Sequence, residues 1–249
     1  MSYLKTLINA TSWREELKEL VDSPLFSQIE EYLNKAREND EIICPCENLI
    51  FRAFELTPFN EVKVVILGQD PYSDIDEETG LYKAMGLSFS IPNGINVSKV
   101  PSLNNIFKEL KREFNYEIPK SNGNLTRWAK QGGLLLNSTL TVGKGKAKDK
   151  ANSHAHFGWQ YFTDGVIKIL SQKKENLVFM LWGDYAHRKA SLIDTSRGHK
   201  ILMATHPAYP APKDYKEINK YGYTVKKFNG CGHFKDCNEH LAINWRLTE

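Results

Sequence analysis

The chain has 249 residues, of which 41% are hydrophobic, 25% charged and 11% aromatic. This composition is typical of a folded globular protein and excludes a disordered chain, a collagen-like repeat and a coiled coil. The net charge is only +3, but segments 143–152 and 207–229 each carry a net +3. Basic segments on a near-neutral chain suit a polyanion such as nucleic acid, although lysine-rich loops can equally serve solubility alone.

The first 56 residues are predicted to be helical. Ser12 and Glu15 have the spacing of a capping box, and Ser23-Pro24 is typical of a helix start. Apolar residues then recur at helical spacing from Ile29 to Ala36.

From residue 62 onward, strands and helices alternate. Short apolar and β-branched runs predict strands at 62–67, 86–91, 133–136, 177–182 and 201–204. Helices are predicted after Pro101-Ser102, over 162–170, from 183 through 193 and near 238–246. This alternation implies a mostly parallel sheet with helices on both faces. Such sheets bind their ligands outside the carboxyl ends of the strands.

Cysteine usage and the N-terminus both indicate an intracellular, cytoplasmic protein. Cys44, Cys46, Cys231 and Cys237 have C-x-C and C-x5-C spacings rather than the usual C-x2-C pairs of metal sites. We therefore expect structural thiols in a reducing compartment and no metal. No secretory signal is visible, and the longest apolar run, 177–182, is shorter than the about 20 residues that span a bilayer. No membrane partner is expected.

Polar side chains follow three of the predicted strands. Gln69-Asp70, with Tyr72 close by, comes after the first strand, Asn137 after the 133–136 strand and His206 after the last. Each is ordinary alone, because Asp often caps a helix, Asn often lies in a turn and a lone His is often structural. Three strand ends that present an acid, an amide and an imidazole to one crevice favour a functional site.

The residue types at this edge suit chemistry on a nucleobase. The chain has no nucleophile elbow, no H-E-x-x-H and no G-x-x-x-x-G-K, which disfavours serine hydrolases, zinc proteases and nucleoside triphosphatases. Asp and His can perform acid–base chemistry or stabilise separated charge, and an Asn amide can recognise one edge of a base. Tyr72 and Phe89 offer flat faces for stacking, although both can equally be core aromatics. With the basic segments, this set suggests a base flipped out of DNA.

Short motifs occur in unbroken order along roughly residues 50–247. They are GQDPY at 68–72, GLSFS at 86–90, WAKQG at 128–132, LLLN at 134–137, ANSH at 151–154, LWG at 181–183, HP at 206–207 and GCGHF at 230–234. This specific combination resembles the main (family 1) uracil-DNA glycosylases, and GQDPY resembles their water-activating motif. Cys231 falls within one of the matching stretches, which further favours a structural thiol.

The resemblance implies a three-layer α/β fold with a central, mostly parallel four-stranded sheet flanked by helices. Residues 1–249 would form one domain, with a helical N-terminal part at 1–56 and the catalytic α/β core at 57–249. The implied activity is that of a monofunctional DNA N-glycosylase. It would flip deoxyuridine out of DNA, hydrolyse the N-glycosidic bond and release uracil, without a metal or cofactor. The abasic site left behind would start base-excision repair.

The resemblance also implies a role for each matching position. Asp70 would orient the attacking water and stabilise the cationic sugar, and His206 would donate a hydrogen bond to uracil O2. Phe89 would stack on the uracil, and Asn137 would recognise its polar edge. Tyr72 would fill the space that a thymine methyl needs.

Further contacts and partners follow from the same resemblance. The backbone around Gln69 would help to bind the base. The implied DNA-contacting residues are Pro101, Ser102, Gly183, Pro207, Ala208 and Tyr209. The substrate would be uracil-containing DNA, single- or double-stranded. A proteinaceous glycosylase inhibitor and downstream repair proteins are candidate partners, and a monomer is the expected state.

Three positions depart from the family pattern. Ser73 stands where a His often follows the Tyr, and Asp184 stands where a Ser often follows Trp-Gly. A carboxylate would be repelled by a phosphate, so Asp184 is expected to turn away or to cap the next helix. The loop at 206–212 lacks the leucine that normally wedges into the duplex. Either segment 207–229 is a solvated insertion whose tyrosines pack locally, or it replaces the wedge with an aromatic ring, Tyr209.

Two functions of different classes remain open from the sequence. The first is an active uracil-DNA glycosylase, favoured by the matching residues at the strand ends. The second is a DNA-binding scaffold or replication accessory that keeps the glycosylase fold with weak activity, and the altered wedge loop gives this alternative its weight. Release of uracil from DNA would discriminate between them.

Overall fold

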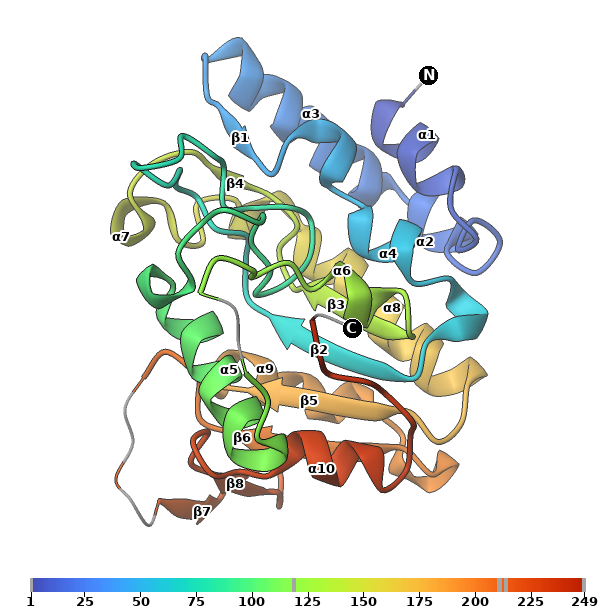
Figure 1. Cartoon of the computed structure of the whole chain (residues 1–249). Coiled ribbons are helices and arrows are strands. Elements are labelled where there is room, and N and C mark those ends of the chain that lie inside the picture. Colours follow the sequence, from blue (N-terminus) through green and yellow to red (C-terminus); the bar gives the residue numbers. More distant parts are fainter. Residues whose placement is uncertain (1, 118–119, 210–211, 213–214, 248–249) are drawn as a thin grey trace.

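Four of the predicted strands lie next to one another in one sheet. In the computed structural model they are parallel and lie in the order β3-β2-β5-β6 (Figure 1). Their bounds are Val64–Gly68 for β2, Gly133–Asn137 for β3, Val178–Trp182 for β5 and Lys200–Ala204 for β6. Every residue of β2, β3 and β5 is buried, which explains why these strands are continuous apolar runs. The structure describes residues 2–117, 120–209, 212 and 215–247.

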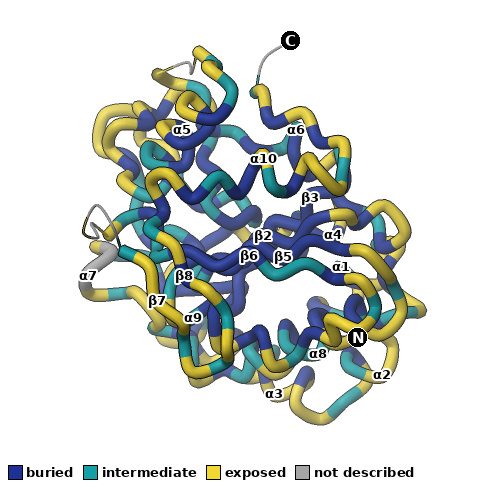
Figure 2. The backbone as a smooth tube through the Cα atoms, turned by 90° about the horizontal axis from the view of Figure 1, so that it is seen from below, coloured by how far each residue is buried: buried dark blue, intermediate teal, exposed yellow. Residues whose placement is uncertain are grey.

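Helices cover both faces of this sheet, so the predicted α/β class is confirmed. Figure 2 shows α2, α3 and α8 on one side of the buried strands and α5 and α10 on the other. The helices are α1 (Tyr3–Asn9), α2 (Lys18–Val21), α3 (Pro24–Glu38), α4 (Arg52–Leu56), α5 (Pro101–Phe114), α6 (Thr126–Ala129), α7 (Ala147–Lys150), α8 (Trp159–Lys173), α9 (Asp184–His187) and α10 (His233–Asn238). Among the described residues, no helix has both the length and the apolar character needed to cross a bilayer.

The sheet is wider than the predicted four strands. β8 (Thr224–Lys226) pairs in parallel with β6, and β7 (Lys216–Ile218) pairs with β8 in antiparallel fashion, which makes six strands. Both added strands lie in segment 207–229, which the sequence indicated to be a loop. The hydrophobic pattern of the sequence did not predict these strands because, of their six residues, only Val225 is buried. A separate two-stranded pair joins β1 (Ile43–Cys44) to β4 (Val142–Gly143). β4 overlaps the start of the first basic segment, 143–152.

Two other predicted elements are wrong. Residues 86–91 form no strand, because Gly86 and Phe89 have φ angles of 73° and 61°, which an extended strand cannot contain. The last helix is α10, which ends at Asn238 rather than running to residue 246. The Asn238 side chain donates to the Ile243 carbonyl and accepts from the Trp245 indole N–H, and so holds the chain in a non-helical turn.

The N-terminal helices pack on the helix layer of the sheet. The Phe162 ring of α8 lies 5.3 Å from that of Phe26 in α3 and 5.9 Å from that of Phe54 in α4. Ser23 caps α3 as predicted, because its hydroxyl accepts from the Phe26 N–H. The predicted capping box at Ser12 is wrong: this hydroxyl accepts from the Phe59 N–H and so joins the first helices to the segment before β2. Buried side chains from residues 4–54 and from the sheet belong to one hydrophobic core.

Candidate active site

The carboxyl ends of the parallel strands bring the predicted polar residues to one edge. Gly68, the last residue of β2, is paired in register with Asn137, the last residue of β3. Asn137 is buried, and its Oδ1 would lie 2.2 Å from a Cβ atom at position 68. Position 68 must therefore be glycine for the amide to lie over the end of β2.

A cavity of about 420 Å³ opens at this edge. Five of the predicted site residues line it: Gln69, Phe89, Gly183, His206 and Tyr209. The sequence did not indicate several other lining residues, namely Trp182, Tyr185, Thr205 and Tyr215. Trp182 belongs to the LWG motif, Tyr185 and Thr205 lie beside the LWG and HP motifs, and Tyr215 belongs to segment 207–229. Their place in the lining was not predicted, because a lining aromatic and a core aromatic look alike in sequence.

The His206 ring has a defined protonation pattern. Its Nδ1 accepts a hydrogen bond from the Ala208 backbone N–H at 3.1 Å. Burial lowers the pKa of His206, which favours the neutral ring. A neutral ring that accepts at Nδ1 carries its proton at Nε2. His206 can therefore donate one hydrogen bond from Nε2 without first being charged.

Asp70 follows β2 and is held by a backbone group from a distant segment. The Asn152 N–H donates to Asp70 Oδ2 at 2.7 Å. Burial raises the pKa of Asp70, whereas the hydrogen bonds from the backbone of Asn152 and of Asp70 itself lower it, and the net direction is upward. The adjacent Gln69 side chain donates to Asn152 Oδ1 at 2.7 Å, so both residues are tied to the same turn.

Of the two predicted aromatic side chains, Phe89 lines the cavity, whereas Tyr72 contacts Phe89 and is not among the lining residues. The Phe89 ring lies 5.6 Å from that of Trp182 and 6.3 Å from that of His206, which places it between β5 and the loop after β6. The Tyr72 hydroxyl donates to the Phe89 carbonyl at 3.3 Å. Burial raises the pKa of Tyr72, so its hydroxyl stays protonated. Tyr72 is thereby fixed against the residue whose ring lines the cavity.

The predicted DNA-contacting loops lie beside each other. Pro101 and Ser102 begin α5, and Asn105 in the next turn donates to the Pro207 carbonyl at 2.7 Å. Tyr209 is 71% exposed, and its ring lies 5.1 Å from that of His206. The start of α5 and residues 207–209 therefore form one continuous rim around the cavity.

The departures from the family pattern have structural explanations. Ser73 is buried, and it contacts Gly145 through both its carbonyl and its hydroxyl, so it faces away from the cavity. Asp184 is the first residue of α9 and is 96% exposed, with no capping hydrogen bond to the helix. Its carboxylate Oδ1 lies 3.8 Å from Nδ1 of His187.

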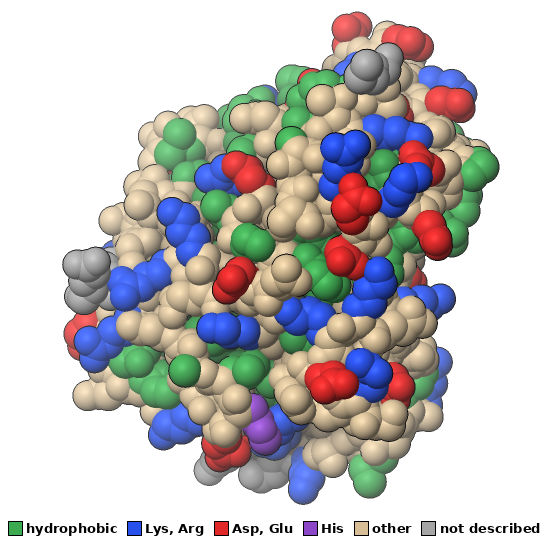
Figure 3. Space-filling view, turned by 90° about the vertical axis from the view of Figure 1, so that its right-hand side faces the viewer, with side chains coloured by type: hydrophobic (Ala, Val, Ile, Leu, Met, Phe, Trp, Pro, Cys, Tyr) green, Lys and Arg blue, Asp and Glu red, His purple; other side chains and the backbone are tan. Residues whose placement is uncertain are grey.

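The insertion at 207–229 divides into parts with different surroundings. Tyr215 and Tyr223 pack against the hydrophobic core, as expected for a locally packed insertion, whereas Tyr209 does not. Lys226 donates to the Cys231 carbonyl, while Lys216 has no ion-pair partner among the residues described. Pro210, Ala211, Lys213 and Asp214, which belong to the same predicted loop, lie outside the described residues. On the face of the molecule that Figure 3 shows, positive and negative side chains are interspersed.

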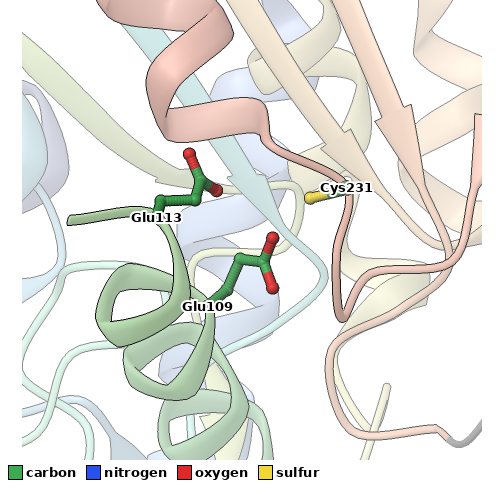
Figure 4. Close-up of side chains that lie close together, drawn as sticks. All are labelled: Glu109, Glu113 and Cys231. Carbon is green, nitrogen blue, oxygen red and sulfur yellow. The ribbon is translucent and has the colours of Figure 1, made fainter. Parts of the chain in front are cut away.

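One cluster of potential metal ligands has another explanation. Glu109 and Glu113 of α5 approach Cys231, with ligand atoms within 4.8 Å of one another (Figure 4). The Glu109 carboxylate accepts from the Gly230 and Gly232 N–H groups, and Glu113 accepts from those of Phe234 and Lys235. Burial raises the pKa of the Cys231 thiol, which disfavours the thiolate that binds metals. The two carboxylates thus anchor the start of α10 to α5.

The comparisons with known proteins agree on one family. The family model described as the uracil DNA glycosylase superfamily matches residues 54–242. A uracil-DNA glycosylase of Campylobacter hominis is 48% identical over 243 residues, which cover 95% of this chain and 92% of that protein. The crystal structure of a mimivirus uracil-DNA glycosylase has 32% identity and a TM-score of 0.79, covering 92% of this chain and 82% of that one. A mimivirus UNG variant in complex with UGI has 32% identity and a TM-score of 0.82, covering 92% and 83%.

The anchor between α5 and α10 predicts a pH dependence of stability. Burial, with a smaller contribution from neighbouring Glu109, raises the pKa of Glu113 from 4.5 to about 7 in the folded chain. The folded state therefore binds a proton that the unfolded state has released, so the free energy of unfolding falls as the pH rises from about 4.5 to 7. The Glu113→Gln variant cannot ionise and should lack this part of the fall.

Urea unfolding at pH 5 and pH 8 measures the effect. Relative to wild type, the Glu113→Gln variant should have a higher unfolding free energy at pH 8 than it has at pH 5. Glu117→Gln, at a side chain that is 93% exposed, serves as the matched control and should follow wild type. An equal difference at both pH values would show that Glu113 is ionised in the folded chain throughout.

Proposed function

The chain belongs to the uracil-DNA glycosylase superfamily, and from this we propose that it hydrolyses the N-glycosidic bond between uracil and deoxyribose in DNA. The products are free uracil and an abasic site, which starts base-excision repair. The observation that carries the residue assignments is the placement of Asp70, Asn137 and a neutral His206 at one sheet edge, where Gln69, Phe89 and His206 line a cavity.

Asp70 acts on the sugar side of the bond. As the glycosidic bond breaks, positive charge develops on the deoxyribose and negative charge on the departing uracil. A carboxylate held beside the cavity stabilises the positive charge and can orient the water that attacks the sugar. The Asn152 N–H fixes one Asp70 oxygen, so the carboxylate need not reorganise during the reaction.

His206 acts on the base side. Its neutral ring has a proton at Nε2, because Nδ1 is occupied by the Ala208 N–H. A hydrogen bond from Nε2 to uracil O2 strengthens as the oxygen gains negative charge, which lowers the barrier rather than only the energy of the bound substrate. Ala208 therefore contributes through its backbone, by selecting the tautomer.

Residues that line the cavity or lie next to its lining supply base selectivity. The Asn137 amide presents one donor and one acceptor, which complement the O4 acceptor and N3 donor of uracil. Phe89 provides a face for stacking, and Tyr72, fixed by its bond to the Phe89 carbonyl, fills the place of a thymine methyl. The backbone of Gln69 completes the wall next to Asp70.

The rim around the cavity contacts DNA. Pro101, Ser102 and Gly183 lie on the elements that approach the phosphate backbone, and Pro207 and Ala208 precede the exposed Tyr209 ring. We assign Tyr209 the place of the missing leucine wedge. Stacking of a base on an aromatic ring is worth about 1–3 kcal/mol, which offsets part of the cost of unpairing.

Several properties of the whole protein complete the proposal. It acts as a monomer on uracil-containing DNA, single- or double-stranded, in an intracellular location with access to DNA. Residues 1–249 form one domain, which the shared hydrophobic core supports. A proteinaceous inhibitor and downstream repair proteins are its proposed partners; the similarity to the mimivirus UNG variant in complex with UGI supports the first.

The role of Asp70 predicts a loss of turnover without a loss of binding. Asp70→Asn should reduce kcat for uracil release by about 100-fold or more, because the carboxylate acts on charge that develops in the transition state. His206→Leu should reduce kcat similarly. DNA affinity of both variants, measured by fluorescence anisotropy, should stay near that of wild type. Asp149→Asn, on the exposed surface of α7, is the control carboxylate. Near-normal kcat in Asp70→Asn or His206→Leu removes that residue from its role.

The roles proposed for Asn137 and Tyr72 predict a change in base preference. Asn137→Asp should relax discrimination against cytosine, because a carboxylate can accept from the cytosine amino group. Tyr72→Ala should make room for the thymine methyl. Chromatography of free bases released from oligonucleotides with uracil, cytosine or thymine measures both effects. If neither variant alters base preference, these residues do not form the base pocket.

The wedge assignment predicts a difference between duplex and single-stranded substrates. Tyr209→Ala should lower kcat/KM on double-stranded DNA more than on single-stranded DNA, because a single strand has no stack to replace. Tyr221→Ala is the matched control, since this tyrosine lies in the turn between β7 and β8, toward the amino ends of the parallel strands. Equal losses on both substrates would reject the wedge and leave a solvated insertion.

A further inference from the structure

The segment from 141 to 154 connects the N-terminal part of the chain to the catalytic edge. On one side, β4 pairs with β1, and the Lys144 N–H donates to the Ile42 carbonyl at 2.6 Å. On the other side, the Gly145 N–H donates to the Ser73 carbonyl, and the Asn152 N–H donates to Asp70. Segment 141–154 therefore lies between residues 41–44 and the turn that carries Asp70.

The bond to Asp70 requires an unusual backbone conformation. Asn152 has a φ angle of 60°, in the left-handed region that non-glycine residues seldom adopt. Asn adopts this region more readily than most residues, and the conformation persists where the surroundings hold it. The contacts that hold residues 150–154 therefore determine whether the Asn152 N–H reaches Asp70.

Glu41 makes those contacts. Its carboxylate accepts from the Lys150 ammonium at 2.9 Å, and its second oxygen lies 3.4 Å from His154 Nε2. The two donors flank Asn152 in sequence, one on each side. A Cβ atom at Gly143 would lie 2.0 Å from Glu41 Oε1, so the carboxylate also rests directly on the backbone of β4.

A buried chain of hydrogen bonds fixes the orientation of His154. The Trp159 indole N–H donates to the Thr141 hydroxyl at 2.7 Å, and this hydroxyl lies 3.0 Å from His154 Nδ1. If the hydroxyl donates to Nδ1, the proton of the neutral ring is at Nε2 and points to Glu41. Burial, more than any other influence, lowers the pKa of His154, which agrees with a neutral ring.

We propose that Glu41 is a positioning residue for Asp70: its carboxylate holds Lys150 and His154 so that the intervening Asn152 keeps its N–H on the catalytic carboxylate. This inference rests on the proposed role of Asp70 in uracil excision. Glu41 lies outside the range 54–242 that the family model matches, and its side chain does not line the catalytic cavity. The N-terminal part of the chain thereby contributes to catalysis without contacting substrate.

The charges around this connection determine its pH behaviour. Glu41 faces Lys150 and His154, and His154 also faces His156. Burial opposes ionisation of Glu41, but Lys150 and His154 hold its pKa below the ordinary value. Asp70 faces the Asn152 N–H and, from α9, the Tyr185 hydroxyl, whose pKa is raised chiefly by burial and also by the nearby carboxylates. Loss of the Asn152 bond therefore raises the pKa of Asp70 further.

The Glu41→Gln variant tests the proposal. Glutamine has one acceptor oxygen for two donors, so its amide NH2 must face either Lys150 or His154. Uracil release from a single-stranded oligonucleotide is followed under steady-state conditions from pH 5 to pH 9. The kcat of this variant should be reduced by about 10-fold near pH 6. A misplaced group can cost up to about 100-fold. The acid limb of the profile should move to higher pH, and KM should stay unchanged.

Two further variants make the test decisive. Glu47→Gln removes another carboxylate of the N-terminal part, one that pairs with Arg37 and, among the described residues, forms no ion pair with segment 141–154. Its profile should match wild type. Lys150→Gln, at a partly exposed position, should shift the acid limb in the same direction. This variant tests the proposal even if Glu41→Gln does not fold. If the folded variants at 41 and 150 keep the wild-type acid limb, Glu41 has no positioning role. If wild type itself releases no uracil, the proposed function fails instead.

Discussion

The candidate site depends on one constraint, the parallel pairing of β3, β2, β5 and β6. Parallel strands place their carboxyl ends at the same edge, so residues that are far apart in the chain meet there. Gly68 lies opposite Asn137, and Trp182 lies opposite Ala204, two residues before His206. The glycine at 68 leaves room for the Asn137 amide, because any side chain there would collide with it. The cavity, the proposed catalytic pair and the rim proposed to contact DNA all follow from this arrangement.

Burial at this edge prepares both groups that we propose to be catalytic, Asp70 and His206, before substrate arrives. It lowers the pKa of His206, so the ring is neutral and donates from Nε2, and it raises the pKa of Asp70. Two backbone N–H groups oppose this effect on Asp70, its own and that of Asn152, which belongs to the segment that we propose Glu41 holds in place. The low-dielectric edge strengthens each hydrogen bond to developing charge, provided that the groups are already oriented. Orientation is therefore the contribution of the residues that never touch the base.

The sequence alone indicated the parallel core and the polar strand ends. Continuous apolar runs that each end in a polar residue gave Asp70, Asn137 and His206, and the resemblance gave their roles. Asn152 could not be found in this way, because it acts through a backbone N–H that every residue except proline possesses. The six residues of β7 and β8 were missed because only Val225 is buried, so no hydrophobic alternation marks them. Residues 86–91 look like a strand in composition, yet the left-handed Phe89 turns its ring toward the cavity. Tertiary context decided each of these cases.

Release of free base from DNA tests the central claim most directly. The protein is incubated in EDTA with oligonucleotides that contain a single uracil, and the released base is separated by chromatography. Matched oligonucleotides with thymine or cytosine at the same position serve as controls. The account predicts free uracil and an equal amount of abasic sites, and no release from the controls. Binding of the uracil oligonucleotide without release would contradict it and would favour a DNA-binding scaffold. Comparable release of thymine or cytosine would contradict the assigned base pocket.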